Sequence, residues 1–158
     1  MRPCGWTQEG FLTREQSLSE VMHQDLTTTH ELGISIKRIS DVLELLLEKG
    51  KNIDAFRPSS MTHYKVRIAH SRRIRTCPWA PKQFEWCRTG RGVKYLTTND
   101  FEVTNTRTEE SLRGTTLCLH LIRDHSFFGG PGTVYRIDPE KAIHILELTR
   151  KRHNRRNE

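Results

Sequence analysis

The spacing of apolar residues predicts an amphipathic helix between residues 35 and 50. Apolar side chains recur there every three or four positions, at Ile36, Ile39, Val42, Leu43, Leu46 and Leu47. This is the period of a helix with one buried face. Ser35 is suited to cap its first turn and Gly50 to end it. A shorter helix is expected over residues 17–26, with the three threonines at 27–29 interrupting it.

The pattern changes to that of β-strands after residue 62. Tyr64, Val66 and Ile68 alternate with more polar residues, which predicts a strand over 63–70 with one buried face. Further strands are expected at 92–96, 100–106, 115–122 and 133–137. The run 115–122 is largely apolar, as a central strand would be. Irregular loops are expected at 77–87 and 127–132.

The last predicted element is a helix that begins at residue 138. Asp138 supplies a cap, Pro139 suits the first helical position, and Glu140 complements the helix dipole. Helices, then strands, then one helix indicate an α+β fold with a mixed or antiparallel sheet. We divide the chain into a helical region, 1–58, and a β-rich region, 59–158, that ends in a basic tail.

The net charge of +7 is concentrated in two segments. Residues 65–94 hold nine Lys and Arg against one acidic residue, and residues 150–158 hold five against one. The remaining two stretches are both slightly acidic. Clustering of this kind is the footprint expected for a polyanionic partner, whereas a merely soluble surface intersperses both signs.

Other features of the composition favour a cytoplasmic protein. No apolar run reaches the roughly 18–20 residues that span a bilayer. The first residues lack the apolar segment of a signal peptide. The four cysteines are irregularly spaced, unlike a secreted disulfide framework, so reduced thiols are expected. We expect no membrane association, and the sequence leaves a homodimer open.

Residues 30–50 resemble the turn and recognition helix of winged helix-turn-helix DNA-binding domains. The matching features are the Leu32-Gly33-Ile34-Ser35 turn, the Arg38-Ile39 pair, Leu43, Leu46 and the closing Lys49-Gly50. The resemblance implies a winged-helix-like N-terminal part whose recognition helix enters the major groove. It would turn four side chains toward DNA, namely Ser35, Lys37, Arg38 and Ser40. The alternative is a core helix with a solvated acidic face, on which Asp41, Glu44 and Glu48 lie.

A second candidate for nucleic-acid contact is the basic segment, residues 65–94. Cations and aromatic rings are interleaved in it, and the candidates are Arg72, Arg73, Arg75, Trp79, Lys82, Trp86, Arg88, Arg91 and Lys94. Basic side chains bind phosphates, and flat rings stack on exposed bases. The alternative is that the tryptophans belong to the core and the arginine stems lie over them. Nothing in the segment distinguishes DNA from RNA.

One group of residues suggests catalysis. His120, Arg123 and His125 lie beside the glycine-rich loop, and two imidazoles with a cation can cleave RNA by general acid–base chemistry. On the predicted strand, His120 faces outward only if the leucine face is the core. If both faces are covered, it is a buried neutral imidazole without chemistry, which is the version we favour. These residues alone do not establish an enzyme, and the activity that they would support is that of a ribonuclease or endonuclease.

Metal ligands and cofactors are not expected from the sequence. His63, His70, Cys77 and Cys87 are separated by 6, 6 and 9 residues, which matches no compact zinc knuckle. Cys118 and His120, expected on one strand, form no ligand set by themselves. We therefore expect a nucleic-acid-binding protein, such as a small DNA-binding regulator or a replication accessory factor. The alternatives are a small metal-independent, toxin-like ribonuclease and a protein-interaction module.

Overall fold

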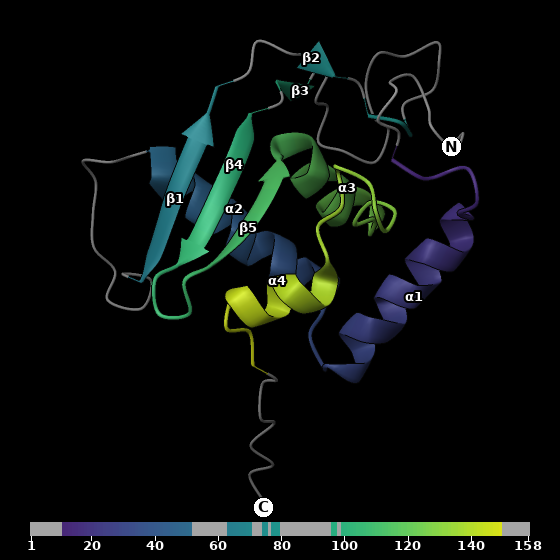
Figure 1. The fold of residues 1–158 in the computed structure, drawn as a ribbon, viewed down its shortest axis with the longest axis horizontal. Helices are drawn as coiled ribbons and strands as arrows, with labels where there is room; N and C mark the ends of the chain where they lie inside the picture. Colours follow the sequence, from purple (N-terminus) through teal and green to yellow (C-terminus); the bar gives the residue numbers. More distant parts are fainter. Residues whose placement is uncertain are drawn as a thin grey trace, which may run out of the picture.

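The computed structural model describes residues 11–51, 63–70, 74–75, 77–79, 96–97 and 99–149. Its helices are α1 (Leu18–Glu31), α2 (Ile36–Lys51), α3 (Thr116–His125) and α4 (Pro139–Ile145). Its strands are β1 (Tyr64–Ala69), β2 (Ile74–Arg75), β3 (Leu96–Thr97), β4 (Asp100–Asn105) and β5 (Glu110–Thr115). The fold is α+β, as predicted, with helices at both ends of the described chain (Figure 1).

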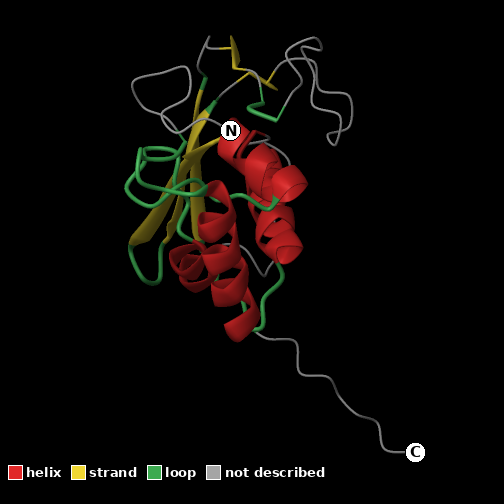
Figure 2. Ribbon diagram, turned by 90° about the vertical axis from the view of Figure 1, so that its right-hand side faces the viewer, coloured by secondary structure: helices red, strands yellow, loops and turns green. Residues whose placement is uncertain are grey.

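The main sheet is antiparallel, in the order β1-β4-β5, and β2 pairs with β3 in a separate two-stranded sheet. Figure 2 shows the strands in one layer and the helices in a layer beside it. The strand over 63–70 is confirmed, and its alternating side chains are alternately half-buried and exposed. Val66 pairs with Val103, which pairs with Leu112, so these residues share the face toward the helices.

The N-terminal helix is longer than predicted, because the threonines at 27–29 do not interrupt it. The hydroxyls of Thr27 and Thr28 donate hydrogen bonds to carbonyl oxygens four residues earlier, and that of Thr29 to one three residues earlier. These back-bonds satisfy the hydroxyls within the helix, where they would otherwise favour a turn. Gly33, with φ of 69°, then turns the chain into α2.

The second helix is confirmed at its beginning and corrected at its end. The Ser35 hydroxyl accepts a hydrogen bond from the Arg38 amide, which makes Ser35 the cap that the sequence indicates. Gly50, however, lies inside α2 instead of ending it. A Cβ atom at Gly50 would lie 2.6 Å from Cγ1 of Val66. The glycine is therefore needed because α2 crosses β1 closely at this point.

The largest correction concerns the strand predicted at 115–122: Thr115 ends β5, and residues 116–122 lie in helix α3. The third strand of the sheet is β5, just before this run. Thr115 switches the chain between the two, since its hydroxyl caps α3 by accepting from the Cys118 amide. Every residue from Leu117 to Ile122 is buried, so the run lacks the polar positions that reveal a helical period.

A smaller correction follows at the C-terminal end. The predicted strand over 133–137 is a pair of turns, closed by bonds from Thr133 N to Gly130 O and from Arg136 N to Thr133 O. Helix α4 begins as predicted, with Asp138 accepting from the Lys141 amide and Pro139 following. It ends at Ile145, and Glu147 takes a positive φ of 49°. The predicted strand at 92–96 and the tail at 150–158 lie almost wholly outside the described residues.

The core consists of two clusters that meet at α3. The larger lies between the sheet and α2 and includes Leu43, Val103 and Ile122. The smaller packs the N-terminal loop and α1 against the other side of α3, through residues that include Leu12, Val21, Leu117, Leu121 and Phe127. Within the described ranges, no helix has both the length and the apolar character needed to cross a membrane.

Candidate functional site

Three metal-binding side chains meet where residues 77–79 contact α3. Their ligand atoms, the thiol sulfur of Cys77 and ring nitrogens of His120 and His125, all lie within 4.8 Å of one another. The histidines are five residues apart on α3, which is about 1.4 helical turns. Cys77 arrives from a different part of the chain, which the smaller core cluster holds against α3. We call Cys77, His120 and His125 the CHH cluster.

His120 is enclosed by protein and only 2% exposed. Its Nδ1 lies 2.6 Å from Oδ2 of Asp124, one turn further along α3. The two atoms are at hydrogen-bonding distance, so the Asp124 carboxylate is the electrostatic partner of this nitrogen. Its other nitrogen, Nε2, is buried and makes no hydrogen bond within the described part of the chain. A buried polar atom in this state needs a physical explanation.

His125 connects Cys77 to an aromatic wall. Its Nε2 lies 3.2 Å from Sγ of Cys77. The Trp79 ring stacks on the imidazole, with centroids 4.4 Å apart and planes 9° from parallel. The rings of Trp79 and Phe127 also meet edge to face, with centroids 5.4 Å apart. The imidazole of His125 therefore has one face against an indole and one nitrogen beside a thiol.

Charged residues connect His120 to α2 through Asp124 and Arg123. Arg123 donates hydrogen bonds to both oxygens of Asp124 and to the Glu44 carboxylate on α2. Burial acts to raise the pKa of Asp124, but the hydrogen bonds and charge of Arg123 outweigh it and lower that pKa. Asp124 is therefore held as a carboxylate beside His120.

Burial also sets the protonation of the two histidines. It lowers the pKa of His120, against the opposing charge of Asp124. It lowers the pKa of His125 as well, with a further contribution from the charge of His120. Both rings are therefore neutral at neutral pH, which leaves a nitrogen lone pair on each. A neutral imidazole can accept a hydrogen bond or coordinate a metal ion.

The structure brings together the three residues that the sequence suggested for catalysis, His120, Arg123 and His125, on one helix. The rings of His120 and His125 are 5.3 Å apart. His120 is nevertheless buried, which is the condition under which the sequence predicts a structural histidine. Sequence reasoning missed the roles of Cys77 and Asp124 here. The signal for Asp124 was its spacing of four from His120, which has meaning only on a helix.

The metal candidates considered from sequence are distributed differently in the structure. His63 lies beside Glu147, with 3.2 Å between Nε2 and Oε2, and His70 is exposed at the end of β1. Cys118 is buried on α3, with its sulfur 3.2 Å from the Thr115 hydroxyl. Of the metal candidates from the sequence, Cys77 and His120 belong to the CHH cluster, and Cys87 lies outside the described residues.

The candidate nucleic-acid residues are only partly described. Lys37 is exposed and pairs with Asp41, and Arg38 is half-buried. Ser40, which the resemblance turns toward DNA, is instead fully buried and donates to the Lys37 carbonyl. Trp79 lies against His125, and the backbone of Arg75 belongs to β2. The others lie outside the described residues: Arg72, Arg73, Lys82, Trp86, Arg88, Arg91 and Lys94.

No family model, curated protein or solved structure matches this chain. The function of the protein is therefore inferred from its own residues and contacts.

Proposed function

We propose that this protein binds nucleic acid, DNA or RNA, through the basic segment 65–94. The observation that carries the proposal is the concentration of charge, nine cations against one acid over 30 residues of an otherwise slightly acidic fold. A phosphate backbone attracts such a cluster and releases counterions when it binds, which supplies most of the affinity of non-specific complexes.

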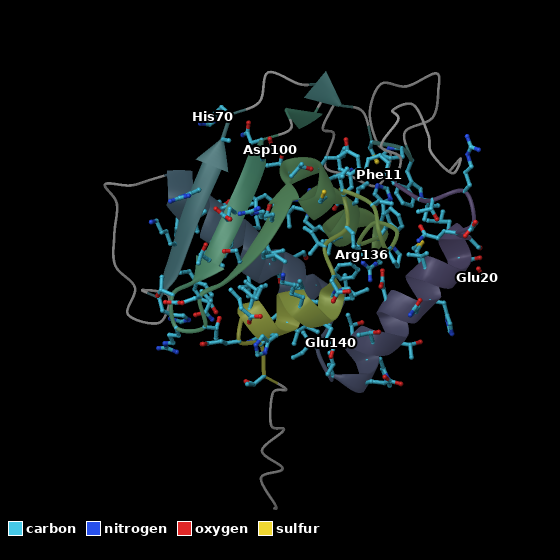
Figure 3. The ribbon with its side chains drawn as sticks, in the orientation of Figure 1. Phe11, Glu20, His70, Asp100, Arg136 and Glu140 are labelled. Carbon is cyan, nitrogen blue, oxygen red and sulfur yellow. The ribbon has the colours of Figure 1, made fainter. Side chains whose placement is uncertain are left out.

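The fold supports this proposal by the position of the segment's described parts. Figure 3 shows His70 and Asp100 at one end of the sheet, where β2 and β3 also lie. Asn99 is fixed there to the beginning of α3, since its amide donates to the Thr116 hydroxyl. Cys77 and Trp79 are fixed to the other end of the same helix. Residues 77–79 of the basic segment are thus fixed against α3.

The test is the salt dependence of binding. Replacing Arg72, Arg73 and Arg75 with Ala should weaken binding to labelled oligonucleotides and reduce the slope of log K against log salt by about one unit per lost phosphate contact. A matched control removes three cations elsewhere, at Arg14, Arg113 and Lys141, which are exposed. An unchanged slope in the first variant would remove these arginines from the interface. Binding without salt dependence would favour a protein-interaction module.

A finer part of the proposal is that α1 and α2 act as a winged-helix-like DNA-binding unit. Its support is the short turn between the helices and the exposure of Lys37 at the beginning of α2. Two ion pairs count against DNA contact by α2. Lys37 already pairs with Asp41, and Glu44 on the same helix pairs with Arg123. Lys37→Ala with Arg38→Ala should reduce duplex binding and leave the fold intact. Full duplex binding by this variant would identify α2 as scaffold.

The metal-independent ribonuclease that uses His120 and His125 is retained as the alternative. The closeness of the two rings favours it, and the burial of His120 opposes it. The assay is cleavage of labelled RNA in the presence of a chelator. Activity with a bell-shaped pH profile, lost in His125→Ala, would replace the binding proposal with this one.

A further inference from the structure

We propose that the CHH cluster is a zinc site, with Cys77 Sγ and one ring nitrogen from each of His120 and His125 as three of the four ligands of the ion. Zinc accepts thiolate and imidazole ligands together and prefers four-coordinate, tetrahedral geometry. This inference does not depend on the proposed nucleic-acid binding, and it goes against our expectation from the sequence that no metal is bound.

The distances between the ligand atoms suit such an ion. Zinc lies about 2.3 Å from sulfur and about 2.0–2.1 Å from nitrogen, so tetrahedral angles separate a sulfur from a nitrogen by about 3.6 Å. Sγ of Cys77 and Nε2 of His125 are 3.2 Å apart. All three ligand atoms lie within 4.8 Å of one another. Shifts of a few tenths of an ångström up to about 1 Å would bring them to coordination distances.

His120 supplies independent support, because its burial is costly without a partner for Nε2. The imidazole is 2% exposed and this nitrogen makes no hydrogen bond within the described residues. Meanwhile the Asp124 carboxylate lies beside Nδ1 on the opposite side of the ring. A carboxylate next to one nitrogen of a histidine whose other nitrogen binds zinc is a recurrent arrangement, which fixes the tautomer and orients the ring.

The surroundings favour a zinc site that fastens the chain over a reactive thiol. Cys77 is buried and belongs to the cluster that contains Leu117, Leu121 and Phe127. Trp79 covers the ring of His125. A nucleophilic cysteine needs access for its substrate, which this enclosure denies. A metal ion would instead fasten residues 77–79, and with them the basic segment, to α3.

The first test uses the full chain, purified without a histidine tag. We expect about one zinc ion per chain by elemental analysis, as a single set of three ligands implies. Removing the ion with a chelator should lower the melting temperature, and adding Zn²⁺ alone should restore it. Replacing zinc by Co²⁺ should give the absorption of a tetrahedral site and a thiolate-to-cobalt charge-transfer band. A chain that binds neither ion, or that binds cobalt without the thiolate band, would overturn the proposal.

Variants then test two of the three ligands. Cys77→Ser and His125→Gln should each lower the affinity for zinc, and Cys77→Ser should abolish the thiolate band. Cys118→Ser is the matched control, because Cys118 is an equally buried thiol on α3 that is not in the CHH cluster. It should keep the metal and the band. Equal zinc binding by Cys77→Ser and wild type, or loss of the band in Cys118→Ser only, would contradict the assignment.

Asp124 is assigned as a positioning residue, and its test needs a readout other than stability. Asp124→Asn keeps the shape of the side chain and removes its charge. It should weaken zinc binding by about 10–100-fold, the usual effect of losing a carboxylate behind a ligating histidine, while the thiolate–cobalt band persists. Zinc affinity equal to wild type in a folded Asp124→Asn would remove Asp124 from the site.

Discussion

Helices α2 and α3 pack against each other in the same fold, yet their sequences differ in how much they reveal. In α2, buried Ile39 and Leu43 alternate with exposed Lys37 and Asp41, and the helical period is visible. In α3, six consecutive residues are buried, from Leu117 to Ile122. The first pattern predicts its own structure, whereas the second fits a buried strand equally well.

The difference arises from the number of faces that are covered. Helix α2 lies on the sheet with one face and leaves the other to solvent. Helix α3 lies between two core clusters, with Ile122 in the larger and Leu121 in the smaller. A helix buried all round loses its polar stripe, so its period cannot be recovered from the sequence.

Alanine substitutions should reproduce this difference as the largest effect that we predict. Leu121→Ala and Ile122→Ala, on two different faces of α3, should each lower the free energy of unfolding by about 2–5 kcal/mol, because each leaves a cavity. In α2, Leu43→Ala should cost about as much, but the 40% exposed Leu45 should cost only about 0.5 kcal/mol when replaced by Ala. Chemical denaturation measures all four.

One outcome would contradict the conclusion that α3 is covered on two faces and α2 on one. If Leu121→Ala were as mild as Leu45→Ala, the smaller cluster would not be a true core, and α3 would have one covered face like α2. Circular dichroism of each folded variant serves as the control, since none of these changes should alter the helix content.

Elements with a local sequence signal were predicted, and elements fixed by tertiary contacts were not. The α2 helix, the strand β1 and the beginning of α4 were all predicted, because alternation and caps are local signals. Strand β5 was missed, since its residues Glu110–Thr115 include a glycine, an arginine and few apolar side chains. Its position in the sheet is fixed by pairing with β4, which is tertiary information.

The candidate site was predicted even less well. His120 and His125 were identified, but His120 was assigned to a strand, where Asp124 could not be placed next to it. Cys77 is more than 40 residues away from both histidines, and only the packing of residues 77–79 on α3 brings it to them. Ligands from separate elements carry no spacing signal, in contrast to the compact knuckles that sequence patterns detect.

Gly50 offers the next test, because the sequence and the structure give it different roles. A Cβ atom at this position would meet Cγ1 of Val66 at 2.6 Å. Gly50→Ala should therefore destabilise the protein by about 1–3 kcal/mol through overpacking of α2 on β1. Without that contact, the same change inside a helix would stabilise it by about 1 kcal/mol. Thermal and urea denaturation both report the sign.

A double mutant sharpens this prediction. In a Val66→Ala background the Cγ1 atom at 2.6 Å is gone and the Cβ atom at 3.0 Å remains, so the cost of Gly50→Ala should shrink. An equal cost in both backgrounds would show that the strain does not come from Cγ1 of Val66. The loss of stability would then have to come from the backbone at Gly50, as expected for a residue that ends a helix.

The polar contacts of Glu147 join parts of the chain that are far apart in the sequence. Glu147, after α4, accepts a hydrogen bond from Asn105 and contacts Arg107 and His63, all far away in the sequence. The hydrogen bond from Asn105, aided by these charges, lowers the pKa of Glu147 below its usual 4.5. Because the folded pKa is the lower one, the stabilisation is present above pH 4.5 and is lost as pH falls through the folded pKa.

Glu147→Gln should therefore be less stable than wild type near neutral pH, and the difference should narrow on acidification below about pH 4.5. Urea denaturation at a series of pH values measures it. Glu140→Gln, an exposed acid at the beginning of α4, is the matched control. A difference between wild type and Glu147→Gln that stays constant with pH would show that the carboxylate contributes no charge-dependent stability.

The smallest predicted effect belongs to the local counterpart, the Lys37–Asp41 pair on α2. Its atoms approach within 2.6 Å, but the side chains are 80% and 50% exposed. Exposed pairs four residues apart contribute about 0.3–0.5 kcal/mol, because water screens the charges and two long side chains are held still. A double-mutant cycle with Lys37→Ala and Asp41→Ala should give a coupling energy of this size that disappears in high salt. A coupling well above about 1 kcal/mol would mean that the exposed face of α2 is less solvated than its pattern indicates. The clearest difference between α2 and α3 would then be lost.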